Sequence, residues 1–572
     1  MSRSDDPSPA LVSQEAVRRL PRWALWFLCL AYTIPGFVGR DPWRDVDLAS
    51  FGIMRALSQS RSLDDWLHPA LMGHAGDAGA LLPYWLGAWA LQLAPPGLSP
   101  GLAARLPFML MLVGILAATW YATYHLARHV SAAPVSFAFG GEASARDYAR
   151  TLADGGVLAL VATLGLAQFS HETTPALAQL FFSTLAFYGL AVLPARTAQS
   201  GIALPCGLLG LSLSGAPMLA LVYALVVAVA LFAPATRHLP AAMRRRARWI
   251  LCLVAAACAL LLLAAGDEWR APRWRFGTDS WNSLGKLLIW FTWPAWPFVL
   301  WALWRWRHQM RHPARNRHLG LPLLIAGAPL LATVFTLDHG RTLFLALPAL
   351  ATLAAFALPT FKRSAAALID WFTVLFFSAW AIIIWVVWIS LQTGVPAKPA
   401  SNVARLAPGF ELSFHLSAFL LAVLGTAAWI ALARWRTARH RPALWKSLVL
   451  PAAGTTLCWV LLTTLWLPGL NYGRSLAPQI LAIRDIVGDA RCVQVGGLTT
   501  AQLAAVQFHG GWRTQPAAGL KAAGCPWLLI TPAARASLRE ADLAPTWQLV
   551  AEVPRPTRAQ ETLLVYRRAA GG

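Results

Sequence analysis

The sequence contains few charged residues, and acidic residues are the scarcest. Asp and Glu account for 25 of 572 residues, against 48 Lys and Arg, and charged residues make up only 13% of the chain. Hydrophobic residues make up 57%, and apolar runs of about 20 residues recur along the chain. This composition excludes an ordinary soluble protein and predicts a polytopic membrane protein. The net charge of +23 does not indicate nucleic-acid binding, because the basic residues cluster in short loops between apolar runs.

The sequence also lacks several motifs that carry chemistry in soluble enzymes. No GxGxxG, P-loop or Gly-x-Ser-x-Gly pattern occurs in a suitable context, which disfavours nucleotide-dependent chemistry. Among seven cysteines there is no CxxC or zinc-type spacing. Cys492 and Cys525 each stand beside a predicted strand, and in an oxidising compartment we expect them to form a disulfide. The first apolar run lacks a small-residue cleavage site, so we predict an uncleaved helix.

The apolar runs predict about thirteen transmembrane helices followed by a small soluble α/β domain. The expected spans are 23–38, 106–126, 152–169, 173–193, 202–215, 217–234, 249–265, 284–303, 319–336, 342–360, 367–391, 412–433 and 447–468. Residues 202–215 and 217–234 are the weakest pair, since they also fit one broken helix. Merging them would move later basic loops to the other side of the membrane, so we keep two.

The basic loops orient the chain. With residues 1–22 as a cytoplasmic tail, the strongly basic loops lie inside, as the positive-inside rule requires. Residues 23–469 then form the membrane body, with a first outside loop at 39–104. Residues 470–572 form the outside domain.

Acidic residues concentrate in that first outside loop. They are Asp41, Asp45, Asp47, Asp64, Asp65 and Asp77. Carboxylates close to one another raise each other's pKa, which suits a general base. Asp is also a favoured N-cap, and the helix-like run 48–57 follows directly. We expect Asp47, supported by Asp45, to carry chemistry at the outer face of the membrane.

Two further charged groups stand at predicted outside ends of spans. His171-Glu172 opens one span, and Asp338-His339-Gly340-Arg341 precedes another. Charged groups at a membrane boundary are costly unless they are used, although a Glu at a helix N-terminus also has a simple capping interpretation. His171, Glu172 and His339 are candidate metal ligands, but their spacing carries no metal signature, so a metal requirement is left open.

One outside loop runs against the charge rule. Residues 266–281 carry Arg270, Arg273 and Arg275 interleaved with tryptophans. Arginine beside aromatic residues suits a lipid phosphate or a phosphate-bearing substrate. The alternative is a solvated loop whose arginines contact lipid headgroups.

Short motifs follow one another in a recognisable order. They are Asp47, Phe51, Asp64-Asp65-Trp66, Leu82-Pro83-Tyr84-Trp85, Ala103-Ala104-Arg105-Leu106-Pro107, the Trp- and Pro-rich run 291–306, and Arg341 before Leu347-Pro348. This order resembles the polyprenyl-phosphate-sugar glycosyltransferases of the GT-C fold, which include protein O-mannosyltransferases and the aminoarabinose transferase that modifies lipid A. Two departures stand out. The family's Asp-Glu pair is Asp47-Leu48 here, and the Lys-Pro of aminoarabinose transferases is Leu82-Pro83.

The resemblance implies an all-α GT-C-like membrane body in a bacterial inner membrane, with a periplasmic active site. It implies transfer of a sugar, with inversion, from a polyprenyl phosphate to lipid A, another glycolipid or a protein. Asp47 would act as general base. Arg105, Arg341 and the three loop arginines would stabilise the lipid phosphate, and His171 and Glu172 would position the acceptor or a metal. Tyr84 and Trp85 would contribute to substrate binding.

Two other classes of function fit a polytopic chain. A transporter or flippase needs charged residues near the middle of the membrane with broken helices around them. Here the charges concentrate at the ends of spans, which argues against transport. A non-catalytic scaffold that presents the C-terminal domain would leave the aspartate-rich loop without a role.

Overall fold

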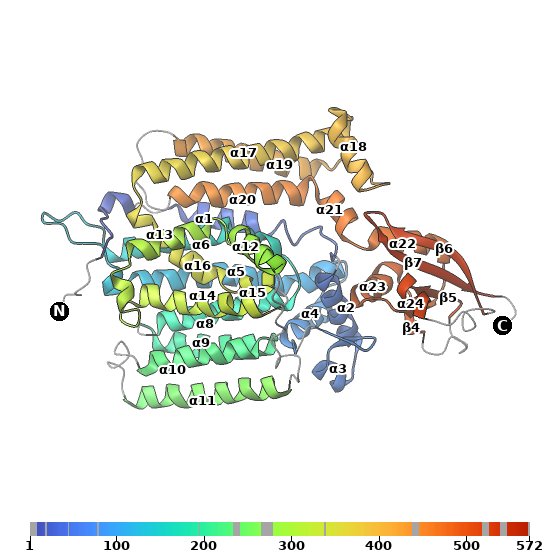
Figure 1. Cartoon of the computed structure of the whole chain (residues 1–572), viewed down its shortest axis with the longest axis horizontal. Helices are drawn as coiled ribbons and strands as arrows, with labels where there is room; N and C mark the ends of the chain where they lie inside the picture. Colours follow the sequence, from blue (N-terminus) through green and yellow to red (C-terminus); the bar gives the residue numbers. More distant parts are fainter. Residues whose placement is uncertain are drawn as a thin grey trace.

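The computed structural model describes residues 8–17, 20–43, 45–76, 79–193, 195–232, 241–264, 278–336, 339–437, 446–517, 525–537 and 546–569. Long helices lie side by side in one bundle, and a small sheet domain sits at one end of it (Figure 1). Helices α17, α19 and α20 form one face of the bundle, and α10 and α11 lie at the opposite face (Figure 1).

Most bundle helices overlap the expected spans, but three of those spans, 152–169, 284–303 and 342–360, are each divided between two helices. Their bounds are α1 Arg22–Thr33, α5 Pro100–Ala127, α6 Ala145–Ala162, α7 Leu164–Phe169, α8 Pro175–Val192, α9 Thr197–Leu213, α10 Pro217–Phe232, α11 Ala241–Ala264, α12 Thr278–Phe291, α13 Ala295–Arg305, α14 Arg317–Phe335, α15 His339–Phe344, α16 Leu347–Ala355, α17 Arg363–Thr393, α19 Leu416–Thr437 and α20 Lys446–Thr464. Within the described ranges, seven helices are long and apolar enough to cross a membrane. An eighth is added if α12 and α13, bent by 84° at their junction, form one span. The count of thirteen stays a prediction.

Local sequence explains where several helices begin and end. The Ser99 hydroxyl accepts a hydrogen bond from the Leu102 N–H, and Pro100 occupies the first turn of α5, where its missing N–H costs nothing. Helices α9 and α10 are separate, because the chain turns between them at Gly215, whose φ is +88°. That conformation favours glycine, and it divides the weakest predicted pair into two helices.

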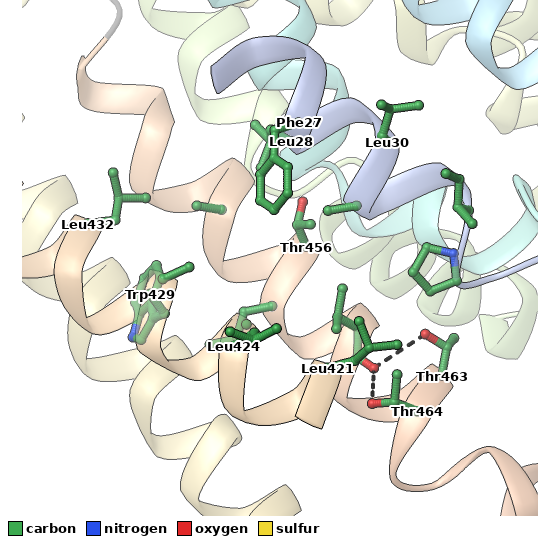
Figure 2. Close-up of a pocket in the computed structure, with 18 of the residues that line it drawn as sticks. Phe27, Leu28, Leu30, Leu421, Leu424, Trp429, Leu432, Thr456, Thr463 and Thr464 are labelled. Carbon is green, nitrogen blue, oxygen red and sulfur yellow. Dashed lines mark hydrogen bonds between the residues drawn. The ribbon is translucent and has the colours of Figure 1, made fainter. Parts of the chain in front are cut away.

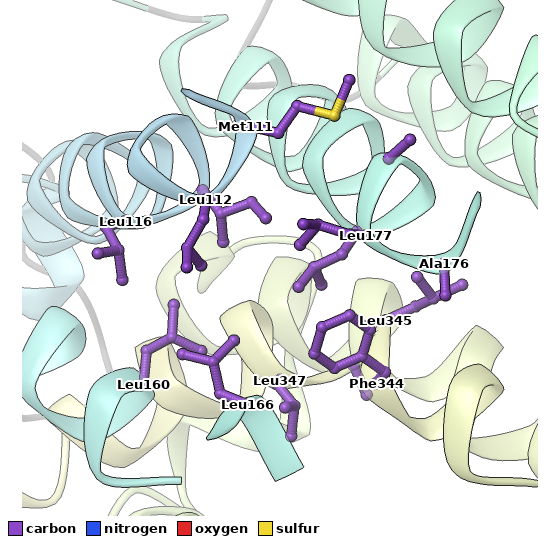
Figure 3. Packing of buried hydrophobic residues seen from close by; sticks show 14 of the residues in the cluster. Met111, Leu112, Leu116, Leu160, Leu166, Ala176, Leu177, Phe344, Leu345 and Leu347 are labelled. Atoms are coloured by element: carbon purple, nitrogen blue, oxygen red, sulfur yellow. The ribbon is translucent and has the colours of Figure 1, made fainter. Parts of the chain in front are cut away.

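The bundle core is aliphatic and tightly packed. Leu112 of α5, Leu160 of α6 and Leu177 of α8 are fully buried and converge with Phe344 of α15 (Figure 3). Small residues bring helix backbones together, since a Cβ added at Gly207 would lie 2.7 Å from the Ala186 amide nitrogen. In a bilayer such close packing, more than expulsion of water, holds neighbouring helices together.

Residues 39–104, the predicted first outside loop, contain short elements at the end of the bundle that carries the sheet domain. They are α2 Val46–Gln59, α3 Leu63–Leu67, β1 Ala70–Leu71, β2 His74–Ala75 and α4 Leu82–Leu93. Helix α2 packs against α4 on one side and against α23 (Thr500–Ala505) of the sheet domain on the other. Phe51 and Phe508 meet edge to face with ring centroids 4.8 Å apart. The C-terminal domain therefore braces the loop that carries Asp47.

The C-terminal domain is a five-stranded mixed sheet in the order β4-β3-β5-β7-β6. Its strands are β3 Cys492–Gly496, β4 Arg513–Pro516, β5 Trp527–Ile530, β6 Trp547–Arg555 and β7 Arg558–Arg568. Strand β3 pairs in parallel with β4 and β5, while β7 runs antiparallel to β5 and β6. A disulfide joins Cys492 to Cys525, with Cα atoms 5.4 Å apart. Helices α21 Leu467–Arg474 and α22 Ala477–Val487 connect the sheet to α20.

Candidate functional site

Asp47 stands in the first turn of α2 and is only 2% exposed. Its Oδ2 atom accepts hydrogen bonds from Arg40 Nη2 at 2.6 Å and from the Trp43 N–H at 3.1 Å. Its Oδ1 atom accepts from the Thr173 N–H at 2.8 Å and from the Thr173 hydroxyl at 2.7 Å. Burial by itself would raise the pKa of Asp47, but Arg40, Arg105 and Thr173 together hold that pKa below its ordinary value. Asp47 is therefore a fixed anion that connects the first outside loop to the 170–174 turn.

Arg40 is the main partner of Asp47, and it is almost as deeply buried. Besides its ion pair with Asp47, it donates from Nη1 to the His171 carbonyl oxygen at 2.8 Å. Arg105, which is 3% exposed, donates to the Arg40 carbonyl oxygen. The Arg40 Nε–H is buried without a hydrogen-bond partner. Two guanidinium groups thus lie around one buried carboxylate, and the Arg40 Nε–H remains available to donate a hydrogen bond.

His171 lies beside this cluster as a neutral, fully packed ring. Its Nε2 bonds to the Tyr32 carbonyl oxygen at 3.0 Å, and its Nδ1 contacts the Ser170 hydroxyl at 3.0 Å. The ring stacks on Trp459 with centroids 4.5 Å apart. Burial and the nearby Arg40 charge lower the pKa of His171 to about 3. These contacts indicate that His171 positions the turn that carries Glu172 and Thr173.

Glu172 is the second carboxylate of the site, and its environment is the reverse of that of Asp47. Arg341 Nη2 lies 3.7 Å from Glu172 Oε2, too far for a hydrogen bond, and Oε2 is buried without a hydrogen-bond partner. Burial, together with the negative charge of Asp47, raises the pKa of Glu172 to about 7. Arg341 also lies over the Phe169 ring, 5.9 Å from its centroid. Glu172 is thus poised to exchange a proton near neutral pH.

Residues that follow the last bundle helix complete the site. Asn471 of α21 accepts hydrogen bonds at Oδ1 from the Asp41 N–H at 3.2 Å and from Trp43 Nε1 at 3.1 Å. Its Nδ2 donates to the Gly39 carbonyl oxygen at 3.1 Å. Arg474 lies 4.9 Å from the Trp43 ring centroid, and its charge lowers the pKa of Glu172. A segment more than 400 residues away in sequence therefore lies against the aspartate-rich loop.

An apolar groove leads away from these residues along the bundle. Its volume is about 1420 Å³, and its walls come from α1, α19 and α20. Phe27, Leu421 and Leu424 point toward it (Figure 2). The Thr463 and Thr464 hydroxyls that line it donate to backbone carbonyl oxygens of their own helix, so they present mainly methyl groups. The groove ends at Gly39 and Asn471, beside Arg40.

Other residues singled out from the sequence occupy different surroundings. Asp45 is exposed at the N-cap position of α2 with φ of +67°, and its side chain makes no capping hydrogen bond. Tyr84 is buried against Gly76, and Trp85 donates from Nε1 to the Trp66 carbonyl oxygen at 2.7 Å. The Trp85 hydrogen bond and the burial of Tyr84 hold the first loop together. Their role in substrate binding stays a prediction.

The expected phosphate-binding loop and the metal hypothesis have different outcomes. Arg270, Arg273 and Arg275 lie outside the described residues, as do Asp77 and Asp338.

His339 opens α15, and its Nδ1 bonds to the Thr333 carbonyl oxygen at 2.6 Å. Where the chain is described, no three His, Cys, Asp or Glu side chains gather as a metal-binding group. Both nitrogens of His171 are already engaged, so its geometry does not fit a metal ligand.

Sequence reasoning did not single out Arg40, Thr173, Asn471 and Arg474. A signal existed for Arg40, because it directly precedes the first aspartate of the loop in a chain with few charges. Thr173 and Asn471 carried no such signal, since each acts through partners that are distant in sequence.

No protein-family model matches this chain, and no curated protein matches it. Solved structures with the same fold include two from Cupriavidus metallidurans. ArnT from Cupriavidus metallidurans bound to undecaprenyl phosphate matches with a TM-score of 0.60 and 16% identity, covering 96% of this chain and 98% of that one. ArnT from the same organism in the apo state matches with a TM-score of 0.56 and 15% identity, covering 95% and 97%. The membrane body and the C-terminal domain of this chain together have the GT-C fold of the lipid A aminoarabinose transferase ArnT.

Proposed function

We propose that this protein is a bacterial inner-membrane glycosyltransferase that moves a sugar from a polyprenyl phosphate to a lipid or protein hydroxyl at the periplasmic face. One observation carries the proposal. Two mostly buried carboxylates, Asp47 and Glu172, lie among arginines at one end of the bundle, and their pKa values are shifted in opposite directions. When the pKa values of two acids in one site are displaced in opposite directions, the two acids have different roles in the reaction. The fold shared with ArnT bound to undecaprenyl phosphate agrees with a polyprenyl-phosphate donor.

Glu172 is the better candidate for the general base. A base works best when its pKa lies near the operating pH, and the pKa of Glu172 is raised to about 7. Asp47 has a lowered pKa, and its two oxygen atoms already accept four hydrogen bonds. We therefore assign Asp47, the general base expected from the sequence, the role of holding Arg40 and the Glu172–Thr173 turn in place. In the reaction, Glu172 takes the proton of the acceptor hydroxyl as its oxygen bonds to the anomeric carbon.

Arginines are suited to stabilise the leaving group. As the bond from the anomeric carbon to the phosphate oxygen breaks, the polyprenyl phosphate gains negative charge. Arg341 stands beside Glu172, Arg474 faces Trp43, and Arg40 has a buried N–H without a partner. Fixed guanidinium groups stabilise a phosphate more effectively than water does in a site partly shielded from solvent. Direct displacement at the anomeric carbon inverts its configuration, which is the expected outcome.

The groove between α1, α19 and α20 fits the hydrocarbon chain of a lipid substrate. Its walls are apolar, and its polar end lies beside Arg40 and Asn471. Leu421 and Leu424, on one wall, are 55% and 64% exposed, so the groove opens sideways toward the surrounding lipid. A lipid that entered from the membrane would keep its hydrocarbon chain in an apolar environment while its headgroup reached the site.

The rival function is transport of a lipid-linked or anionic substrate. The sharp bend between α12 and α13 is the kind of helix break that transporters use. Among the described residues, the bend is flanked by aromatic side chains, since the Trp293 and Trp296 rings lie 6.3 Å apart. Asp154, within α6, accepts a hydrogen bond from Trp120 Nε1 at 2.8 Å. Enzymatic transfer accounts for the Asp47–Glu172 site, whereas transport leaves it unexplained.

The decisive experiment is a transfer assay in vesicles that contain the purified protein and a polyprenyl-phosphate sugar. Mass spectrometry of lipid A and glycolipids from cells with and without the gene identifies the acceptor. We expect a sugar-mass increment that depends on the gene and disappears in Glu172→Gln. Movement of the intact donor across the bilayer without bond cleavage would replace the enzyme proposal with the transporter.

A further inference from the structure

A second, smaller cavity lies at the opposite end of the bundle from Asp47. Its volume is about 300 Å³, and it is lined by His125, Leu126, Arg128, His129, Val130, Ala191, Ala195 and Arg317. Helix α5 connects the two ends, with Arg105 near its start and Arg128 at its C-cap. These positions are 23 residues apart, or about 35 Å at the helical rise per residue. That distance is close to the ~30 Å thickness of the hydrocarbon layer, so the cavity lies near the opposite membrane boundary.

The cavity is lined by basic residues and by no acidic residue. Four of its eight lining residues are His or Arg, and Arg196 is close enough to act on the charge of His125. Burial and the Arg317 charge lower the pKa of His129 to about 4. Burial is the larger of these two causes, and the smaller one, the Arg317 charge, agrees with the basic lining of the cavity. An anion placed there would relieve the repulsion between Arg317 and a protonated His129.

Arg317 gives the clearest indication of a ligand. It is only 9% exposed, yet no acidic residue of the described ranges forms an ion pair with it. Its Nη2 donates to the Leu190 carbonyl oxygen at 2.8 Å, which satisfies the end of α8. This cap uses one of the five N–H donors of a guanidinium group. A mostly buried charge without a counter-charge is costly, and an anionic ligand would remove that cost.

The surroundings favour a phosphate that belongs to a lipid. Val130, on the rim, is 79% exposed, and Leu126 and Ala191 add apolar surface. Basic pockets between transmembrane helices near the cytoplasmic boundary bind anionic headgroups. We propose that this cavity binds the phosphate of an anionic membrane lipid and thereby ties the ends of α5 and α8 to the start of α14. This site is independent of the glycosyl-transfer proposal.

The test uses the full-length protein in a neutral detergent and measures Tm against added ligand. Phosphatidylglycerol should raise Tm to a plateau, because a ligand that binds only the folded state stabilises it. Phosphatidylcholine, which carries no net charge, should have a much smaller effect. Inorganic phosphate is titrated separately. A comparable rise with phosphate would show that the free ion alone fills the site, whereas a rise only with phosphatidylglycerol identifies the lipid headgroup.

Variants decide whether the effect arises in this cavity. Arg128→Gln removes an exposed lining charge and should weaken half-saturation about fivefold, the equivalent of ~1 kcal/mol per basic residue near an anionic headgroup. His129→Gln provides a second variant that leaves the α8 cap intact. Arg311→Gln, an exposed arginine of the neighbouring turn Gln309–Arg311 outside the cavity, is the matched control. The proposal fails if neither anion raises Tm. It also fails if Arg128→Gln and His129→Gln both respond as the wild type and the Arg311→Gln control do.

Discussion

Glu172 and Asp47 act on each other electrostatically, yet their pKa values are displaced in opposite directions. Asp47 has two arginines and Thr173 around it, so it stays ionised although it is buried. Glu172 has no hydrogen bond to Oε2 and feels the negative charge of Asp47, so its protonated form is favoured. We infer that Asp47 organises the site and that Glu172 accepts the proton.

The transfer rate should therefore depend on pH through Glu172. Only the ionised carboxylate accepts a proton, so kcat/KM should rise with pH to a plateau, with a midpoint near the pKa of about 7. Glu172→Gln should abolish transfer. The exposed Glu411, changed to Gln, is the control and should keep the wild-type profile. A rate independent of pH between about 5 and 8 would remove Glu172 as the base.

The same pKa shift predicts how stability changes with pH. The pKa of Glu172 in the folded protein exceeds its ordinary value of 4.5, so between about 4.5 and 7 the folded state binds more protons than the unfolded state. The free energy of unfolding should therefore fall as pH rises through this range. Glu172→Gln should remove that decline, which thermal unfolding at several pH values would measure. An unchanged slope in the variant would show that other groups cause it.

Asp47→Asn should reduce both stability and activity. Loss of the negative charge leaves Arg40 buried without its counter-charge, and breaking a buried ion pair from one side costs about 3–5 kcal/mol. Thermal unfolding measures the first effect, and transfer by the folded fraction measures the second. Asp64→Asn, an exposed change in the same loop, should alter stability by less than about 0.5 kcal/mol. Wild-type turnover by folded Asp47→Asn would mean that the site does not need Asp47.

Much of the architecture was predictable from the sequence. Apolar runs indicate helices, and alternation of apolar and polar residues indicates strands, and both patterns depend only on neighbouring residues. The strand expected beside Cys525 is β5, and the helix-like run 48–57 lies within α2. Strand β4 was missed because its residues, Arg513–Pro516, are polar and carry no hydrophobic alternation. It is defined by pairing with β3, which sequence order alone does not reveal.

The candidate site was only partly predictable. Position at a membrane boundary singled out Glu172 and Arg341, the acid-rich first loop singled out Asp47, and the motif resemblance singled out Arg105. The structure places these four residues together. The division of roles between the acids was not predictable, because it depends on which arginine faces which carboxylate. Arg40 pairs with Asp47 and Arg341 with Glu172, and both arrangements arise from contacts between separate segments.

The disulfide provides a test of the predicted orientation. Cys492 and Cys525 should be oxidised in cells if the C-terminal domain lies in the periplasm, because the cytoplasm keeps thiols reduced. Thiol labelling of denatured protein, with and without prior reduction, measures this directly. Replacing both cysteines with Ala should destabilise the domain by up to about 4 kcal/mol, given the 33-residue separation. Free thiols at both positions in freshly isolated membranes would contradict the orientation.

The groove can be tested by filling it. Gly425 lines it, and a Cβ there would meet only ordinary contacts, 3.6 Å from Val460 and 3.7 Å from Leu457. Gly425→Trp should therefore fold and occupy the space meant for a hydrocarbon chain. The KM for a long-chain lipid substrate should rise, while that for a short-chain analogue should change little. The substrate whose KM responds, donor or acceptor, is the one that the groove holds.

The matched control for this change is Gly327→Trp on α14, because a Cβ at Gly327 meets nothing within 4 Å and the residue does not line the groove. It adds the same side chain to another bundle helix. Unchanged KM values for both lipids in Gly425→Trp would show that the groove is not used.

The packing around His171 should be equally sensitive to added volume. A Cβ at Gly36 would lie 2.1 Å from His171 Cδ2, and the ring is confined on another side by Trp459. Gly36→Ala must therefore displace the ring or the α1 end, at a cost of about 1–3 kcal/mol. Because the His171 carbonyl oxygen holds Arg40, and Glu172 and Thr173 follow directly, transfer should fall even in protein that remains folded.

The control is Gly201→Ala in α9, where a Cβ meets nothing within 4 Å. Alanine is favoured over glycine in a helix, so this variant should gain about 0.5–1 kcal/mol and keep full activity. The pair separates the effect of a methyl group in a helix from its effect beside His171. If Gly36→Ala matched Gly201→Ala in both stability and transfer, the ring would have room to move, and its proposed role in positioning Glu172 would be lost.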